Sequence, residues 1–196
     1  MTLSFPVALK LEARSCLVVG NGNEALQRLE ALAGAGARVS LVSGSPSPEL
    51  EARARELGVE LLRRDYQTAD LEGIWLAVCC EMDAALASRM GADADARQVF
   101  FCAIDQPAPS SFSHVALTRS GPLFVAIGTE GKAPALARRL KHEFARALGT
   151  PVVEQFIDAL VRLRESAPAE HRASQVTQEA LRLRLDGAFV VDDPKH

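Results

Sequence analysis

Two features of this chain have residue types and spacing suited to small-molecule chemistry. Residues 20–25 read G-N-G-N-E-A, a glycine-rich turn of the G-x-G-x-x-A type that accommodates a dinucleotide pyrophosphate. Asp105 follows the apolar run Val99–Ala103, so its carboxylate stands where a strand would end. A carboxylate there can act as a general base, although an Asp before Gln106 and Pro107 can also simply form a turn. The sequence therefore offers a nucleotide-binding turn and a candidate base.

Each small residue of the glycine-rich turn is expected to have its own structural role. Gly20 permits the tight turn, Gly22 lets the backbone approach a phosphate, and Ala25 allows close contact between helix and strand. Backbone amides at the start of the following helix would hold the pyrophosphate at its positive end. The alternative is a tight turn that binds nothing. The expected cofactor-binding residues are Gly20, Asn21, Gly22, Asn23, Glu24 and Ala25.

The end of the second expected strand bears on which dinucleotide would bind. An NAD site usually has Asp or Glu there for the ribose hydroxyls, and an NADP site usually has a nearby Arg. This chain has neither, so we expect Ser43, Gly44 and Ser45 to contact the ribose through hydroxyls and backbone. NAD is favoured over NADP because no basic residue stands at this tip.

Alternating strands and helices position these residues. Short apolar runs suited to buried parallel strands are separated by helix-like segments at Ala25–Ala35, Pro48–Leu57 and Asp83–Asp95. Such alternation indicates an α/β fold with a Rossmann-type parallel sheet. The five expected strands are Cys16–Val19, Val39–Val42, Val59–Leu62, Ile74–Cys79 and Val99–Ala103.

The pattern changes after Pro109. Val115–Thr118 and Leu123–Ile127 flank a turn at residues 119–122 and predict a hairpin. Three helices should follow, beginning at Pro134, at Pro151 and near Ala173, with the third ending near Leu185. The side chains expected to face inward are Leu136, Leu140 and Phe144 in the first of these helices, and Val152, Phe156, Ile157 and Leu160 in the second.

Composition narrows the class of protein. A net charge of −3 argues against a surface built for nucleic acid. We expect no secretory signal in residues 1–14 and no membrane-spanning segment, since no apolar run is long enough. The cysteines at 16, 79, 80 and 102 are interpreted as reduced, buried thiols, and the expected location is cytoplasmic.

Several segments together resemble the precorrin-2 dehydrogenase family, the N-terminal module of siroheme synthases. They are Pro6–Arg14, Cys16–Gly22, Ala35–Val39, Phe101–Asp105, Gly121–Ile127 and Gly131–Arg138, and the resemblance covers about residues 3–150. It implies a stand-alone NAD-dependent enzyme that oxidises precorrin-2 to sirohydrochlorin, and a homodimer held largely by its second domain. The implied domains are a Rossmann domain over 1–111, a small α+β dimerisation and substrate domain over 112–150, and a C-terminal helical segment over 151–196.

The resemblance also implies roles for individual residues. Asp105 matches the family's catalytic aspartate, which would take the proton lost from the macrocycle. Thr129 stands where a family serine lines the substrate site. The substrate is a polycarboxylate, and residues 132–146 hold five Lys or Arg side chains and one Glu, of which Lys132 and Arg138 are the expected contacts. The chain departs from the family at Glu81, where a threonine is usual.

Other readings remain open. Some family members also insert iron or cobalt, but the four histidines have no ligand spacing, so we expect no metal ligands and keep chelation as a secondary activity. The chain could instead be a regulatory module that senses NAD without catalysis, or a tetrapyrrole-binding protein that has lost turnover. Neither alternative requires Asp105 as a base.

Overall fold

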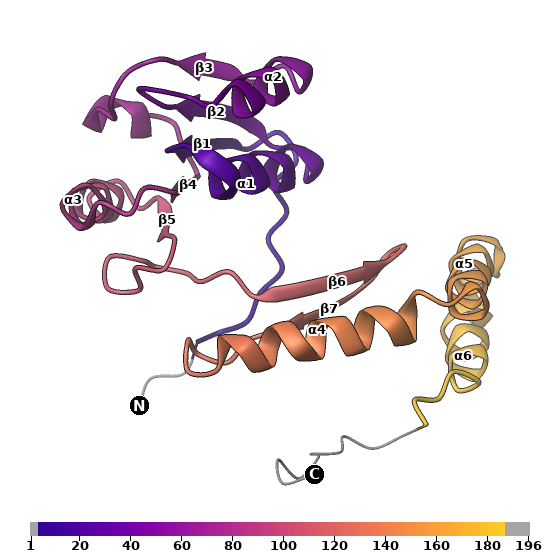
Figure 1. The fold of residues 1–196 in the computed structure, drawn as a ribbon. Coiled ribbons are helices and arrows are strands. Elements are labelled where there is room, and N and C mark those ends of the chain that lie inside the picture. Colours follow the sequence, from indigo (N-terminus) through magenta and orange to yellow (C-terminus); the bar gives the residue numbers. More distant parts are fainter. Residues whose placement is uncertain (1–3, 187–196) are drawn as a thin grey trace, which may run out of the picture. The chain divides into compact units, whose positions relative to one another are not determined.

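The structure is a computed structural model that describes residues 4–186, shown as a ribbon in Figure 1. The chain divides into two compact units, the first ending at His114 and the second beginning at Val115.

The first unit contains a five-stranded parallel sheet with the order β3-β2-β1-β4-β5. The strand order reverses at β1, which pairs with β2 on one side and β4 on the other. This arrangement confirms the expected α/β Rossmann-type fold and all five expected strands. Their bounds are β1 Ser15–Val19, β2 Arg38–Val42, β3 Glu60–Leu62, β4 Leu76–Cys79 and β5 Phe100–Ala103.

Alternate side chains of the central strands fill two separate cores, one on each face of the sheet. Leu17 and Val19 of β1 pack with Phe101 and other residues on one face, whereas Cys16 and Val18 pack on the other. Successive side chains of a strand point to opposite faces, so a strand covered on both sides must be apolar at every position. The continuous apolar runs in the sequence follow from this double burial.

Helices cover both faces of this sheet (Figure 1). Helices α1 (Gly22–Gly34) and α2 (Pro48–Glu56) contribute to one core, and α3 (Ala84–Asp95) with the short 3₁₀ helix η1 (Thr68–Leu71) contributes to the other. The Asp83 carboxylate caps α3 by accepting hydrogen bonds from the amides of residues 85 and 86 at 2.8 and 3.2 Å.

The edge strand β5 is closed by the segment that follows it. Ser111 donates its amide to the Phe101 carbonyl at 2.8 Å, and its Oγ accepts from the Phe101 amide at 2.9 Å. Ser110 Oγ accepts from the Ala103 amide at 3.0 Å. These bonds satisfy groups that an edge strand would otherwise leave open. They also fix the turn that carries Asp105 between the strand and the two serines.

The second unit begins with an antiparallel hairpin of β6 (Ala116–Ser120) and β7 (Leu123–Ile127). The predicted hairpin is confirmed, but β6 extends to Ser120, so the turn is shorter than expected and consists of Gly121 and Pro122 alone. Gly121 has φ +54°, which glycine supplies at the first position of a two-residue hairpin turn.

In the described part of the second unit, residues 115–186, three helices follow the hairpin: α4 (Pro134–Leu148), α5 (Pro151–Ser166) and α6 (Ala169–Ala180). The prediction of a third helix from about Ala173 to Leu185 was wrong at both ends, because α6 begins at Ala169 and ends at Ala180. Pro168, with its fixed φ, directly precedes the first helical residue. Residues 187–196 of the expected C-terminal segment lie outside the described residues. Within residues 4–186, no helix is long and apolar enough to cross a membrane.

Two residues expected to face inward are exposed. Leu136 of α4 is 52% exposed, because this helix centres its packed face on Ala137, one residue further along. Val152 of α5 is 76% exposed, because it lies in the first turn, before the buried Ile157. Spacing alone identified the apolar residues of each helix but not the rotation of its packed face.

Gly91 in α3 packs closely against the segment after β5. A Cβ atom at Gly91 would lie 2.8 Å from both Cβ and the carbonyl oxygen of Pro109. We expect Gly91→Ala to lower the free energy of unfolding by about 1–3 kcal/mol through overpacking, measured by urea denaturation. The control is Gly34→Ala in α1, because no neighbouring atom lies within 4 Å of a Cβ at that position. This substitution should be neutral or stabilising. Equal effects of the two substitutions would contradict this account.

Candidate functional site

A cavity of about 670 Å³ lies at the carboxyl edge of the parallel sheet. It is lined by segments that follow four strands: residues 20–21 after β1, 43–45 after β2, 64–66 after β3, and 81–89 after β4. Ligands of open α/β sheets bind in such a crevice, where the strand order reverses. The structure thus brings Gly20 and Asn21 together with Ser43, Gly44 and Ser45, which sequence analysis had placed in one site.

Glycine is needed at positions 20 and 22 of the turn for different structural reasons. Gly20 has φ +129°, and a Cβ there would lie 3.1 Å from backbone and side-chain carbons of Cys80. Gly22 has φ +72° and no atom within 4 Å of a Cβ position. Gly20 is therefore required by close contact with the end of β4, whereas Gly22 keeps the space beside the start of α1 open. Ala25, fully buried against the sheet, permits the close helix packing expected of it.

Asn21 ties the glycine-rich turn to the loop after β2. Its Nδ2 donates to the Ser45 carbonyl at 2.7 Å, and its Oδ1 accepts from the Ser47 amide at 2.8 Å. Although Asn21 occupies the N-cap position of α1, its side chain makes no capping bond to that helix. The first-turn amides of α1, near Asn23 and Glu24, consequently carry no side-chain cap and retain their positive potential for an anion.

Sequence analysis missed the residues that the β3–η1 connection adds to the cavity. Arg64, Asp65 and Tyr66 line it, and so does Arg89 of α3. The reason given for NAD, that no basic residue stands nearby, was therefore wrong. Because β3 runs parallel to β2 and pairs with it, its carboxyl end reaches the same edge, and a single sequence does not reveal this pairing.

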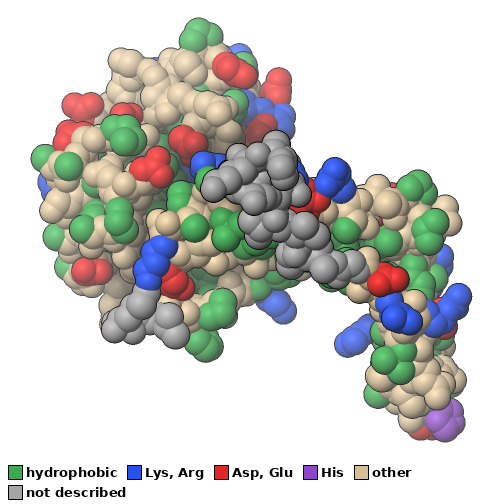
Figure 2. All heavy atoms as spheres, turned by 60° about the horizontal axis from the view of Figure 1, so that its bottom comes forward, with side chains coloured by type: hydrophobic (Ala, Val, Ile, Leu, Met, Phe, Trp, Pro, Cys, Tyr) green, Lys and Arg blue, Asp and Glu red, His purple; other side chains and the backbone are tan. Residues whose placement is uncertain are grey.

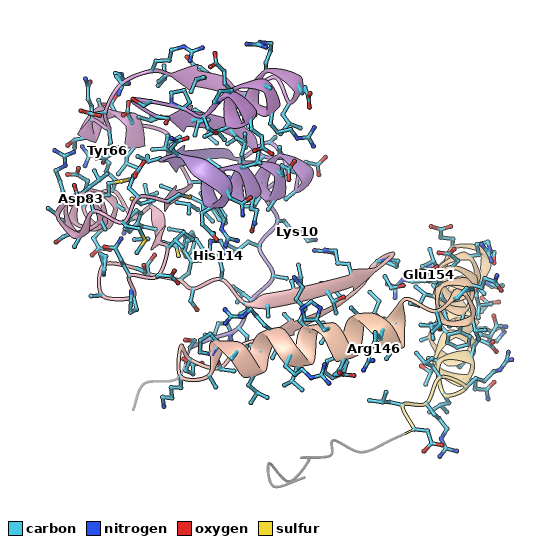
Figure 3. All side chains as sticks on the ribbon, in the orientation of Figure 1. Lys10, Tyr66, Asp83, His114, Arg146 and Glu154 are labelled. Atoms are coloured by element: carbon cyan, nitrogen blue, oxygen red, sulfur yellow. The ribbon has the colours of Figure 1, made fainter. Side chains whose placement is uncertain are left out.

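Both of these arginines are already engaged. Arg64 holds the Asp70 carboxylate with two nitrogens, at 2.8 and 2.6 Å. These hydrogen bonds hold the pKa of Asp70 below its usual value. The Arg89 guanidinium lies 5.4 Å from the centre of the Tyr66 ring and donates to the Tyr66 carbonyl at 3.4 Å. Figure 3 shows Tyr66 and the capping residue Asp83 on this part of the first unit.

Asp105 lies at the carboxyl end of β5, on an exposed turn. Its φ of +57° is left-handed, a conformation that Asp and Asn tolerate better than most residues. The neighbouring Gln106 donates from Nε2 to the Glu81 carbonyl at 3.0 Å, which links this turn to the loop after β4. Asp105 does not line the 670 Å³ cavity. Glu81, which stands where the family usually has a threonine, does line it.

The expected substrate residues belong to the second unit and gather before and within the first turns of α4. Thr129 Oγ1 accepts from the Ala133 amide at 3.4 Å, and its carbonyl accepts from the Lys132 amide at 2.9 Å. Lys132 and Arg138 are exposed. Glu143 forms ion pairs with Arg139 and Arg146, so two of the five basic side chains of this segment are partly neutralised.

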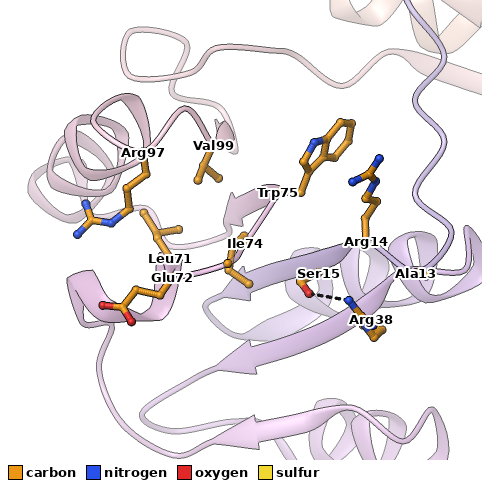
Figure 4. Close-up of a pocket in the computed structure, with 11 residues that line it drawn as sticks. Ala13, Arg14, Ser15, Arg38, Leu71, Glu72, Ile74, Trp75, Arg97 and Val99 are labelled. Carbon is orange, nitrogen blue, oxygen red and sulfur yellow. Dashed lines mark hydrogen bonds between the residues drawn. The ribbon is translucent and has the colours of Figure 1, made fainter.

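A second cavity, of about 550 Å³, opens at the opposite, amino edge of the sheet (Figure 4). Arg14 lies over the Trp75 ring at 5.4 Å from its centre, and Arg38 donates to Ser15 Oγ at 3.5 Å. None of the residues predicted for a site lies here, and the glycine-rich turn is at the other edge of the same strands. The cavity at the carboxyl edge is therefore the candidate site.

All four cysteines are unpaired, and three of them are buried. Burial raises the pKa of Cys80 to about 12 and that of Cys16 to about 11, so both are neutral thiols rather than thiolate ligands. Within residues 4–186, no group of three or more His, Cys, Asp or Glu side chains is placed to hold a metal ion.

Comparison with known proteins agrees with this geometry. A family model described as "Putative NAD(P)-binding" matches residues 7–116. Siroheme synthase 1 of Cronobacter sakazakii is 36% identical over 143 residues, which cover 73% of this chain and 30% of that protein. Siroheme synthase of Pseudomonas entomophila is 38% identical over 136 residues, covering 69% of this chain and 29% of that protein. The chain thus spans about three tenths of the length of these relatives.

A solved structure of SirC, precorrin-2 dehydrogenase, superposes with a TM-score of 0.73 at 21% identity, covering 89% of this chain and 88% of that one. At this identity the match shows a shared fold. Because the matched region covers most of both chains, the likeness is not confined to the sheet.

The Asn21 contacts predict a measurable loss of stability. We expect Asn21→Ala to lower the free energy of unfolding by about 1–3 kcal/mol, because the Ser45 carbonyl and the Ser47 amide would each lose a partner. The matched control is Asn23→Ala, an exposed asparagine in the same turn, whose effect should stay within about 0.5 kcal/mol. Urea denaturation compares the two. If Asn23→Ala cost as much, the link between the two loops would not be the cause.

Proposed function

We propose, from the premise that this chain belongs to the NAD(P)-binding family whose model it matches, that it uses NAD to oxidise precorrin-2 to sirohydrochlorin. The observation that carries the proposal is the cavity beside the glycine-rich turn at the point where the strand order reverses. The 143 residues similar to siroheme synthase 1 exceed the length of the first unit, so the similarity continues into the second.

The residues of the turn fit a dinucleotide. Uncapped amides at the start of α1 would hold its pyrophosphate, and the open space beside Gly22 leaves room for it. When bound, the nicotinamide supplies the acceptor for the hydride that leaves the substrate. Ser43, Gly44 and Ser45 would contact the adenosine half. The unpaired thiols fit a reducing cytoplasm.

Asp105 would accept the proton that leaves the macrocycle as the hydride departs. The carboxylate is exposed and therefore accessible to a large substrate. Its turn is held through Ser110, whose Oγ donates to the Gln106 carbonyl at 2.8 Å, and through the bond from Gln106 to Glu81. A fixed turn with an accessible carboxylate suits a general base.

Thr129, Lys132 and Arg138 would bind the carboxylates of the substrate. Lys132 and Arg138 carry positive charge, and Thr129 orders the loop before α4 by accepting from the Ala133 amide. On the face shown in Figure 2, acidic and basic side chains are both spread over the surface, so a polyanion needs such a local basic site.

The second unit would also form the homodimer. Its hairpin packs one face against α4, and the other face presents Leu117 at 37% and Phe124 at 40% exposure. Apolar side chains gathered on one side of a two-stranded sheet favour contact with a partner.

The dimer is tested by sedimentation of the purified chain. We expect a dimer for the unchanged protein and a shift toward monomer for Phe124→Asp, because the substitution would bury a charge in the interface. Circular dichroism provides the check that the variant is folded. A monomeric unchanged protein would refute the proposed assembly.

Asp105→Asn is the sharpest test of the catalytic proposal, because Asn tolerates the left-handed backbone that Ala would strain. We expect kcat for precorrin-2 oxidation, followed by absorbance of the reduced cofactor, to fall by about 10²- to 10⁴-fold. NAD affinity, measured by calorimetry, should be unchanged. Asp95→Asn, an exposed carboxylate at the end of α3, is the control and should retain full activity.

The same assay separates the rival functions. A module that only senses NAD would bind the cofactor with no turnover of precorrin-2. A degenerate binding protein would bind the tetrapyrrole without reducing NAD. Normal turnover by Asp105→Asn would show that another group removes the proton.

A further inference from the structure

The cavity at the glycine-rich turn is lined by a carboxylate, Asp65, whose place in the sequence does not mark it as a cofactor-binding residue. Dinucleotide sites of this fold usually place an Asp or Glu at the end of the second strand, where it accepts hydrogen bonds from the adenosine ribose. In this chain β2 ends at Val42 and the following residues 43–45 read S-G-S, so no acid stands there. Asp65, which follows the neighbouring strand β3, lines the same cavity.

The pairing of β2 with β3 brings the two tips together. The strands are parallel with Val42 opposite Leu62, and the Ser43 amide donates to the Leu62 carbonyl at 3.0 Å. Asp65 Oδ1 lies 3.0 Å from the position that a Cβ atom would take on Gly44. The missing side chain of Gly44 therefore makes room for a carboxylate directly at the tip of β2.

We propose, on the basis of the function proposed above, that Asp65 binds the adenosine ribose hydroxyls of NAD and discriminates against NADP. The carboxylate would accept hydrogen bonds from the hydroxyls, as an acid on β2 does in other members of the fold. The 2′-phosphate of NADP would instead meet a like charge and have no hydroxyl to donate at that position.

The basic residues of the cavity do not offset this discrimination. Arg64 is committed to Asp70, whose side chain is only 6% exposed, and its Nη1 also donates to the Asp65 carbonyl at 3.0 Å. That contact helps to fix the backbone that presents Asp65. Arg89 lies over Tyr66. A 2′-phosphate would have to draw these guanidinium groups away from their partners before either could bind it.

Calorimetric titration of the full chain with NAD and, separately, NADP tests this assignment without reference to turnover. The unchanged protein should prefer NAD. Asp65→Asn should weaken NAD binding by about 10- to 100-fold, the size expected for a lost hydrogen bond to a charged group. The ratio of NADP to NAD affinity should rise in the same variant.

The matched control is Glu72→Gln, which removes one negative charge at the amino-edge cavity of the same unit. Both affinities should match those of the unchanged protein. If Asp65→Asn leaves the ratio unchanged, or if both variants shift it equally, the assignment of Asp65 is overturned while the dehydrogenase proposal stands. A preference for NADP in the unchanged protein also overturns it. If the unchanged protein binds neither dinucleotide, the proposed function itself fails.

Discussion

The parallel pairing of the five strands is the constraint on which the rest of this structure depends. Parallel strands end at the same edge, so residues far apart in sequence meet there without any local signal that relates them. The reversal of order at β1 leaves a crevice between the connections that leave in opposite directions. The glycine-rich turn, the tip of β2 and the β3–η1 connection all line one cavity for this reason.

The same constraint explains what the sequence could and could not predict. The strands and the order of elements follow from continuous apolar runs. Gly20 and Ser43–Ser45 line one cavity, and their proximity could be expected because the glycine motif implies its own strand and helix. Asp65 and Arg64 were missed, since strand order, unlike strand location, has no signature in a single sequence. The exposure of Leu136 was missed because helical spacing gives the apolar residues of a helix and not the rotation that tertiary contacts select.

Electrostatics at the site depends on pairs rather than on a count of charges. Two arginines line the cavity, which by composition alone would suggest a phosphate site. Arg64 is nevertheless held by a nearly buried carboxylate, and a guanidinium bound through two nitrogens has few donors left for a ligand. Asp65 has no comparable partner in the arginine that precedes it, because Arg64 contacts its carbonyl rather than its carboxylate. A dinucleotide bound in this cavity would therefore contact the Asp65 carboxylate rather than the Arg64 guanidinium.

The turn that carries Asp105 combines rigidity with access. An edge strand normally leaves its backbone open to unwanted pairing. In this chain the hydroxyls of Ser110 and Ser111 and the amide of Ser111 close that edge. The groups that protect β5 thus also hold the turn at its end. Close packing of Gly91 against Pro109 restricts the same segment from the side of α3. If Asp105 is the proposed base, it would have to be exposed to reach a bulky substrate and fixed in position to accept a proton. Closing the edge of the sheet satisfies both requirements, since it fixes the backbone of the turn and leaves the carboxylate exposed.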